Sequence, residues 1–171
     1  MAFLPDNAVR RPFHKIEEEL EYSFSRSDIL EEALTHASYA NENGINRYNE
    51  RLEFLGDAVL ELCVTEMLYR QHPSCDEGQL TKARSQIVRE ATLASWALYY
   101  GLPDFLLLSR GLEQQGGRKN PSVLADGMEA VIGAICLDGG YSAAFAVIQK
   151  MAGETTVCEE PAKDAKSCLQ E

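Results

Sequence analysis

The fold is decided by the stretch Glu50-Arg51-Leu52-Glu53-Phe54-Leu55-Gly56-Asp57-Ala58-Val59-Leu60. At about 100° per residue around a helix, its three acids fall within roughly 60° of one another. The apolar residues on the opposite side are Leu52, Leu55, Val59 and Leu62. The pattern predicts a helix with one apolar face directed at a core and one face bearing three carboxylates.

A solvated, charge-neutralised surface is the ordinary interpretation of such an acidic face. A second acidic pair, Asp126 and Glu129 within Leu124–Ala134, favours another interpretation. These acids lie opposite the apolar positions Met128, Val131 and Ile135. Because this helix is otherwise strongly apolar, two acids within it are costly unless they are paired or coordinated. Two helices that offer carboxylates to a common point would form a metal site.

Oxygen ligands of this kind select hard cations such as Mg²⁺ or Mn²⁺ over zinc or copper. Two ions about 4 Å apart would suit in-line attack of water on a phosphodiester. A di-iron helical bundle is the obvious rival, but it requires Glu-x-x-His, and His14, His36 and His72 do not supply that spacing. The chain contains no CxxC pair, so a thiolate zinc site is not indicated.

Helical periodicity extends along almost the whole chain of 171 residues. The predicted helices span 13–22, 28–36, 48–70, 79–100, 122–137 and 142–151, with a polar loop at 41–46 and a Gly-rich connector at 111–121. No alternation is long enough for a sheet, which predicts an all-α class. No apolar run approaches the roughly 20 residues of a membrane span, and no signal peptide precedes the domain, so we expect a cytoplasmic protein without a membrane partner.

The run Asn49–Leu60 resembles the signature of the ribonuclease III family without interruption. The similarity covers most of residues 13–152 in the family's order. It includes Leu34-Thr35-His36-Ala37-Ser38-Tyr39-Ala40, Asp76-Glu77-Gly78, Gly116-Gly117-Arg118-Lys119, Leu124-Ala125-Asp126 and Glu129-Ala130. The resemblance implies the all-α endonuclease fold of that family and an enzyme that hydrolyses double-stranded RNA during RNA processing. The implied products carry 5′-phosphates, 3′-hydroxyls and short 3′ overhangs.

The resemblance also implies roles for individual acids. The implied metal ligands are Glu53, Asp57, Asp126 and Glu129, with Mg²⁺ as the cofactor and Mn²⁺ able to substitute. Asp57 and Glu129 are implied catalytic residues, and the loss of Glu129 should be the most damaging. Glu50 and Glu77 match further acids of the catalytic valley and are assigned supporting roles.

A homodimer is implied as well, with Phe54 inserted into the other subunit. On geometry, Phe54 projects near the carboxylate side of its helix, where it is either partly exposed or covered by a partner. The implied domain organisation is a catalytic domain at 1–153, a linker at 154–163, and the start of a truncated double-stranded-RNA-binding domain at 164–171.

The formal net charge of −11 argues, taken alone, against binding to nucleic acid. A missing RNA-binding domain and bound cations that invert the local sign would answer this objection. We predict Arg118 and Lys119, just before the second acidic helix, as substrate contacts, although a solvated surface charge remains the alternative for each. His36 is expected to be structural, and Gly127, between the two acids, costs up to about 1 kcal/mol relative to Ala in a helix.

Two other classes of function compete with an active nuclease. A catalytically silent scaffold with the same fold should have lost one or more of the acids, whereas all four principal ones are present. An unrelated acidic helical interaction module would leave the shared pattern unexplained. Both comparisons favour the enzyme.

Overall fold

The computed structural model describes residues 13–153, and every regular element within that range is a helix. The α-helices are α1 (His14–Leu20), α2 (Ser27–Leu34), α3 (Ala37–Asn43), α4 (Glu50–Gln71), α5 (Glu77–Ile87), α6 (Glu90–Tyr99), α7 (Arg110–Gln114) and α8 (Pro121–Ala152). Two 3₁₀ turns, η1 (Leu102–Asp104) and η2 (Gly117–Lys119), join the later helices. The all-α prediction is confirmed.

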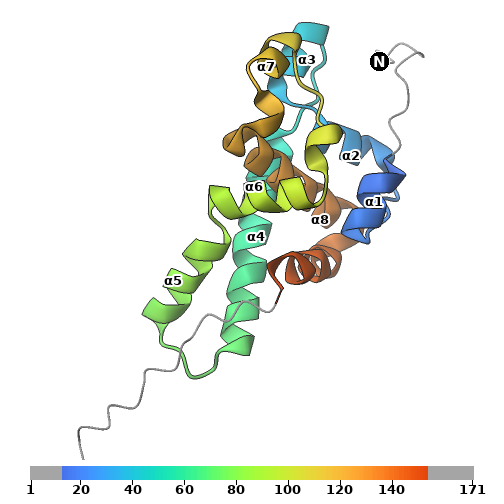
Figure 1. Cartoon of the computed structure of the whole chain (residues 1–171). Helices are drawn as coiled ribbons and strands as arrows, with labels where there is room; N and C mark the ends of the chain where they lie inside the picture. The colour runs from blue at the N-terminus through green and yellow to red at the C-terminus, as the bar shows by residue number, and fades with distance from the viewer. Residues whose placement is uncertain (1–12, 154–171) are drawn as a thin grey trace, which may run out of the picture.

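Helix α8 forms the centre of the fold, and α4, α6 and α2 pack against it (Figure 1). The large side chains that α8 buries completely are Leu124, Met128, Ile132 and Ile135. Helix α5 lies along the C-terminal part of α4 (Figure 1). By length and composition alone α8 could cross a membrane, but core helices pass the same test, and its packing accounts for its apolar side chains.

A kink at Gly140 divides α8 into two straight parts. The residue has φ 81° and ψ 178°, a conformation that side-chain-bearing residues rarely adopt. The carboxylate of Asp138 fixes this corner, because it accepts hydrogen bonds from the Tyr22 hydroxyl (2.7 Å) and from the backbone N–H groups of Ser25 (2.9 Å) and Arg26 (3.0 Å). The predicted interruption between helices 122–137 and 142–151 is therefore confirmed, because α8 consists of two helical segments that meet at the non-helical Gly140.

Two predicted boundaries were wrong. The single helix expected over 79–100 is broken at Val88–Arg89, where Arg89 has an extended backbone (φ −71°, ψ 151°). The first part, α5, packs against α4, and the second part, α6, packs against α8. The loop expected at 41–46 is partly helical, because α3 continues to Asn43 and ends at Gly44 in the left-handed conformation. Leu62, expected on the buried side of α4, is 56% exposed.

The crossing of α4 and α8 brings the two backbones into direct contact at two glycines. A Cβ on Gly56 would lie 1.8 Å from the carbonyl oxygen of Glu129, and a Cβ on Gly133 would lie 2.2 Å from the carbonyl oxygen of Leu52. Both distances are far below a van der Waals contact, so neither position admits a side chain at this helix separation. The acids one turn away on each helix are consequently held close together.

We expect Gly56→Ala to lower the free energy of unfolding by at least about 1–3 kcal/mol, because the new methyl must push α4 away from α8. Urea denaturation followed by circular dichroism measures the change. Gly111→Ala is the matched control: it lies in α7 with no atom within 4 Å of the added Cβ. It should raise stability by up to about 1 kcal/mol through helix propensity. Equal stability of Gly56→Ala and the unsubstituted protein would contradict the backbone contact.

Candidate metal and catalytic site

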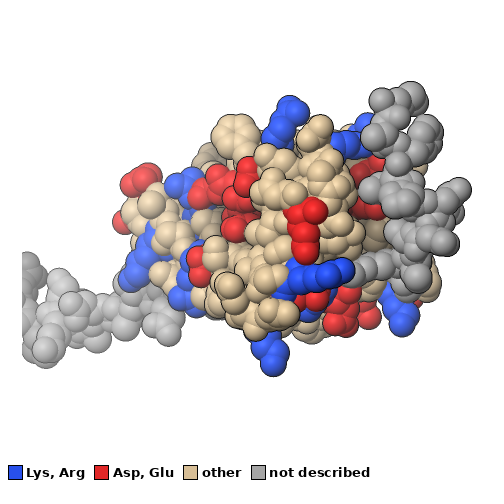
Figure 2. Space-filling model, turned by 90° about the horizontal axis from the view of Figure 1, so that it is seen from above, with Lys and Arg blue, Asp and Glu red and all other residues tan. Residues whose placement is uncertain are grey.

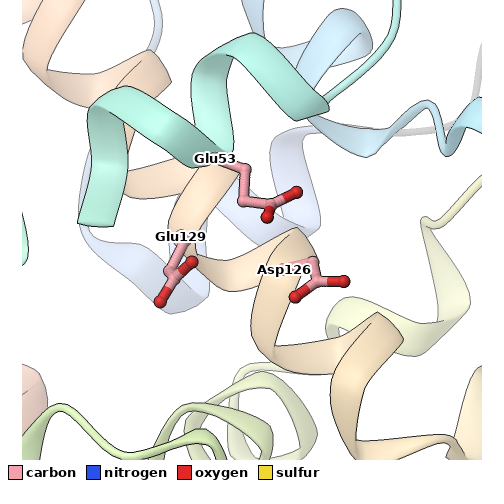
Figure 3. Close-up of side chains that lie close together, drawn as sticks. All are labelled: Glu53, Asp126 and Glu129. Carbon is pink, nitrogen blue, oxygen red and sulfur yellow. The ribbon is translucent and has the colours of Figure 1, made fainter.

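Three carboxylates from two helices converge beside the glycine crossing. Glu53 comes from α4, and Asp126 and Glu129 come from successive turns of α8 (Figure 3). Each offers one oxygen atom, and these oxygens lie within 4.8 Å of one another. All three residues are half-buried, so the charges are partly removed from water.

Asp57 lies on the next turn of α4 and is exposed. Its carboxylate is not one of the three that converge, but its charge acts on both Glu53 and Glu129. Four acids thus share one electrostatic environment, while three of them are close enough to bind one ion.

This environment raises the pKa of each half-buried acid. Burial is the largest cause for Glu129, followed by the charges of Asp57, Glu53 and Asp126, and together they raise its pKa to about 7. Burial and then the charges of Asp126, Glu50 and Asp57 raise the pKa of Glu53. Burial is also the main cause of the raised pKa of Asp126, partly opposed by His36.

The donor set fits a hard divalent cation. All of its ligand atoms are carboxylate oxygens, which Mg²⁺ and Mn²⁺ prefer. Burial raises the pKa of all three bare carboxyl groups, and the charges of neighbouring acids raise those of Glu53 and Glu129 further. A bound cation would favour their ionised forms, because it supplies the positive charge that the protein does not place there.

A cavity of about 380 Å³ adjoins the cluster. It is lined by His36, Ala37, Asn49, Glu50, Glu53 and Asp126. Glu50 is exposed at the start of α4 and thus lies at the cavity, next to the cluster but outside the three converging oxygens.

His36 forms the N-cap of α3. Its Nδ1 accepts a hydrogen bond from the backbone N–H of Ser38 (3.0 Å) and lies 2.8 Å from the Ser38 hydroxyl. The expectation of a structural histidine is therefore confirmed. Burial lowers its pKa, against the opposing charges of Asp126 and Glu50.

Asn49 was missed as a site residue, although it opens the signature stretch. Its side chain is 2% exposed in this polar region. Its backbone N–H donates to the Thr35 carbonyl oxygen (2.9 Å), and its carbonyl accepts from Glu53 (2.8 Å). Asn49 therefore connects the first turn of α4 to the segment that carries His36. A polar residue that immediately precedes an acidic helix was the available signal.

Glu77 is remote from the cluster within one chain. It lies in the first turn of α5, the helix that begins beyond the C-terminal end of α4 (Figure 1). There its carboxylate accepts a hydrogen bond from the Thr81 hydroxyl (2.9 Å). The 22 residues of α4 place roughly 30 Å of helix between that end and Glu50. A contribution of Glu77 to this site would have to come from a second chain.

The two cations predicted to contact substrate differ in their surroundings. Arg118 donates to the carbonyl oxygens of Pro103 and Leu106 and to the carboxylate of Glu113, so its guanidinium holds the loop together. Lys119 is exposed at the end of η2, immediately before the residue that caps α8. On the face drawn in Figure 2, acidic and basic side chains are interspersed, and the described residues form no continuous basic surface there.

Gly127, whose cost to helix stability was expected from the sequence, has a packing role. It is buried, and a Cβ there would lie 3.1 Å from a methyl of Leu106 and 3.3 Å from a methyl of Leu102. The absence of a side chain lets η1 and the following segment pack directly against α8 between the two acids.

Comparisons with known proteins agree with this arrangement. A family model described as ribonuclease-III-like matches residues 26–154, which include both acidic helices. The protein named Ribonuclease 3 from Oleidesulfovibrio alaskensis is 50% identical over 163 residues, covering 93% of this chain and 71% of that protein. Ribonuclease 3 from Nitratidesulfovibrio vulgaris is 43% identical over 165 residues, covering 94% of this chain and 65% of that protein.

Solved structures are similar as well. The nuclease domain of ribonuclease III from Campylobacter jejuni superposes with a TM-score of 0.78 and 40% identity, over 82% of this chain and 93% of that one. A second structure of the same domain, with a TM-score of 0.77 and 41% identity over 81% of this chain and 94% of that one, is described as flexible in a region involved in dimer formation. Both sequence and fold therefore match over most of the described range.

We expect Glu129→Gln to stabilise the metal-free protein at pH 8. The pKa of Glu129 in the folded state, about 7, lies above its ordinary value of 4.5. Its ionisation therefore opposes folding above pH 7, and this penalty disappears as the pH falls toward 5. Thermal unfolding in EDTA should show a higher midpoint for the variant at pH 8 and a smaller difference at pH 5.

Added Mg²⁺ should then raise the midpoint of the unsubstituted protein more than that of the variant, because the ion binds the folded state. Glu18→Gln, at an exposed acid of α1, is the control and should respond to neither pH nor metal in this way. A metal-free Glu129→Gln that unfolds below the unsubstituted protein at pH 8 would contradict the repulsion.

Proposed function

Because the chain belongs to the ribonuclease III family, we propose that it is a metal-dependent endoribonuclease that cuts double-stranded RNA. The observation that supports this most directly is the convergence of Glu53, Asp126 and Glu129 beside an open cavity. The chain spans 71% and 65% of the lengths of the two relatives described above. The activity of the full-length relatives is therefore a proposal for this chain. We also propose that it works in the cytoplasm, where bacterial RNA is processed.

Glu53, Asp126 and Glu129 would hold the cation, and Asp57 would complete the set from the next turn of α4. Mg²⁺ is the proposed ion and Mn²⁺ the proposed substitute, since both prefer oxygen ligands. A divalent cation bound to such a set stabilises negative charge on a phosphodiester and lowers the pKa of bound water. We restrict the role of Glu50 to the adjoining cavity, where its carboxylate is exposed.

The exposed carboxylate of Asp57 is the proposed acceptor of a proton from the attacking water. The water oxygen bonds to phosphorus, the bond between phosphorus and the 3′-oxygen breaks, and the departing oxygen takes a proton from solvent. This sequence leaves a 5′-phosphate and a 3′-hydroxyl. Lys119, exposed just before α8, is the proposed phosphate contact; Arg118 supports it by holding the loop.

A homodimer would place two such sites on the two strands of a duplex. Helix α4 presents the aromatic and apolar residues Phe54, Ala58, Leu62 and Tyr69 to solvent. They fall within roughly 80° of one another around the helix. Phe54 is 82% exposed and Tyr69 is 73% exposed, and two such exposed aromatic side chains on one helix face are unusual. We propose this stripe as the dimer interface; Glu77 would then act on the partner's site.

The proposed catalytic domain, 1–153, contains all of these residues. The linker predicted at 154–163 and the start of an RNA-binding domain predicted at 164–171 lie outside the described residues, and both stay predictions. An RNA-binding domain beyond the catalytic domain would supply phosphate contacts that the acidic surface does not.

Cleavage of a long RNA duplex at low salt with Mg²⁺ or Mn²⁺ tests the proposed activity. We expect short staggered duplex products from the unsubstituted protein. Glu129→Gln should reduce the rate by at least roughly a hundredfold, because it removes a ligand and a charge. Glu18→Gln, on the exposed face of α1, should cleave at the unsubstituted rate. Intact RNA at high protein concentration with either ion would leave a catalytically silent fold as the better interpretation.

Sedimentation equilibrium tests the interface. Phe54→Ala should weaken the dimer by roughly 30-fold, the effect of about 2 kcal/mol at a central aromatic contact. Leu98→Ala is the control, since Leu98 is 57% exposed on α6 and lies outside the stripe. Equal dimerisation of the Phe54 variant and the control would show that another surface forms the interface.

A further inference from the structure

The tautomer of His36 is set by the backbone of α3. The N–H of Ser38 can only donate, so Nδ1 of the imidazole must be an unprotonated acceptor (3.0 Å). A neutral ring that accepts at Nδ1 has its proton on Nε2. The hydroxyl oxygen of Ser38 lies 2.8 Å from Nδ1. The same oxygen accepts a hydrogen bond from the backbone N–H of Ser109 (3.1 Å). The fold therefore maintains Nε2 as a hydrogen-bond donor.

This donor is left without a protein acceptor. Within the part of the chain that the structure describes, both ring hydrogen bonds of His36 are made by Nδ1. The ring lines the cavity beside the carboxylate cluster, together with the small side chain of Ala37. The charge of Asp126 acts on the ring more strongly than that of Glu50, but within residues 13–153 no hydrogen bond joins His36 to either carboxylate, so Nε2–H can still donate to a group that enters the cavity.

Two polar cavity groups besides His36 lie outside the metal cluster: Glu50, which can only accept, and the amide of Asn49, which both donates and accepts. A group that fills the cavity between His36 and Glu50 must therefore accept from one and donate to the other. A phosphate oxygen cannot donate, and the Glu50 charge would repel it. A hydroxyl does both, and the ribose 2′-hydroxyl is the hydroxyl that separates RNA from DNA.

We propose that Nε2–H of His36 donates to a ribose 2′-hydroxyl next to the scissile phosphate, whose own proton is accepted by Glu50. His36 is then a specificity-determining residue as well as a helix cap. This inference rests on the proposed cleavage of RNA duplexes. It adds the side chain by which the nuclease domain itself distinguishes RNA from DNA.

His36→Asn separates the two roles. Asparagine is a preferred N-cap whose side-chain oxygen can accept from Ser38, but its short side chain cannot reach as far as Nε2. We expect this variant to unfold near the temperature of the unsubstituted protein, whereas His36→Ala, which loses the cap, should unfold earlier. His14→Asn, at an exposed histidine of α1, is the matched control for composition.

Single-turnover cleavage of short duplexes provides the readout, with a single 2′-deoxy substitution moved along the nucleotides that flank the cut. At one position the unsubstituted enzyme and His14→Asn should slow by roughly tenfold, the effect of one hydrogen bond. His36→Asn should be slow on the all-RNA duplex and lose nothing further at that position. Such non-additivity is expected only if the ring and the hydroxyl interact.

Losses that multiply at every position would overturn the inference and leave His36 with its structural role alone. Indifference of the unsubstituted enzyme to every 2′-deoxy substitution would overturn it as well, and this result needs no variant to fold. Failure of the unsubstituted enzyme to cut the all-RNA duplex would instead overturn the proposed function, and this inference with it.

Discussion

The contact between two glycines is the constraint on which the rest of the structure depends. Gly56 and Gly133 let α4 and α8 cross with their backbones touching, and a side chain at either position would collide with the facing carbonyl group. Glu53 lies one turn before the first glycine, and Glu129 lies one turn before the second. The helix separation therefore sets the distance between their carboxylates, so that packing and chemistry are controlled by the same contact.

This crossing has an electrostatic cost. It buries Glu129 among other acids, and burial first and the charges of its acidic neighbours second raise the pKa of Glu129 to about 7. The apolar core around α8 must offset that cost, which explains why two acids can lie on a helix that is otherwise so apolar. A site that is unfavourable as bare protein and favourable with a cation illustrates the usual conflict between stability and function.

The sequence could predict those parts of the site that depend on spacing within one helix, but not those that depend on contacts between helices. Helical periodicity located the acidic faces at Glu53 and Glu129, because spacing along one helix determines which side chains share a side. It could not show which helices cross, and the break at Val88–Arg89 follows from α6 packing on α8 rather than from a local signal. The engagement of Arg118 by distant carbonyl groups is likewise a tertiary contact, invisible to charge counting.

The distribution of charge explains how an acidic domain can act on a polyanion. Six of its cations already form ion pairs within the protein, namely Arg26, Arg47, Arg70, Arg84, Arg118 and Lys150. The remaining cations are outnumbered by carboxylates, since the formal net charge of the whole chain is −11, so the long-range field does not attract phosphates. Recognition near the cut must rely instead on short-range interactions: a cation held by carboxylates, and neutral donors in fixed orientation. Because such groups act only at contact, they can distinguish one sugar from another, which a diffuse basic surface cannot do.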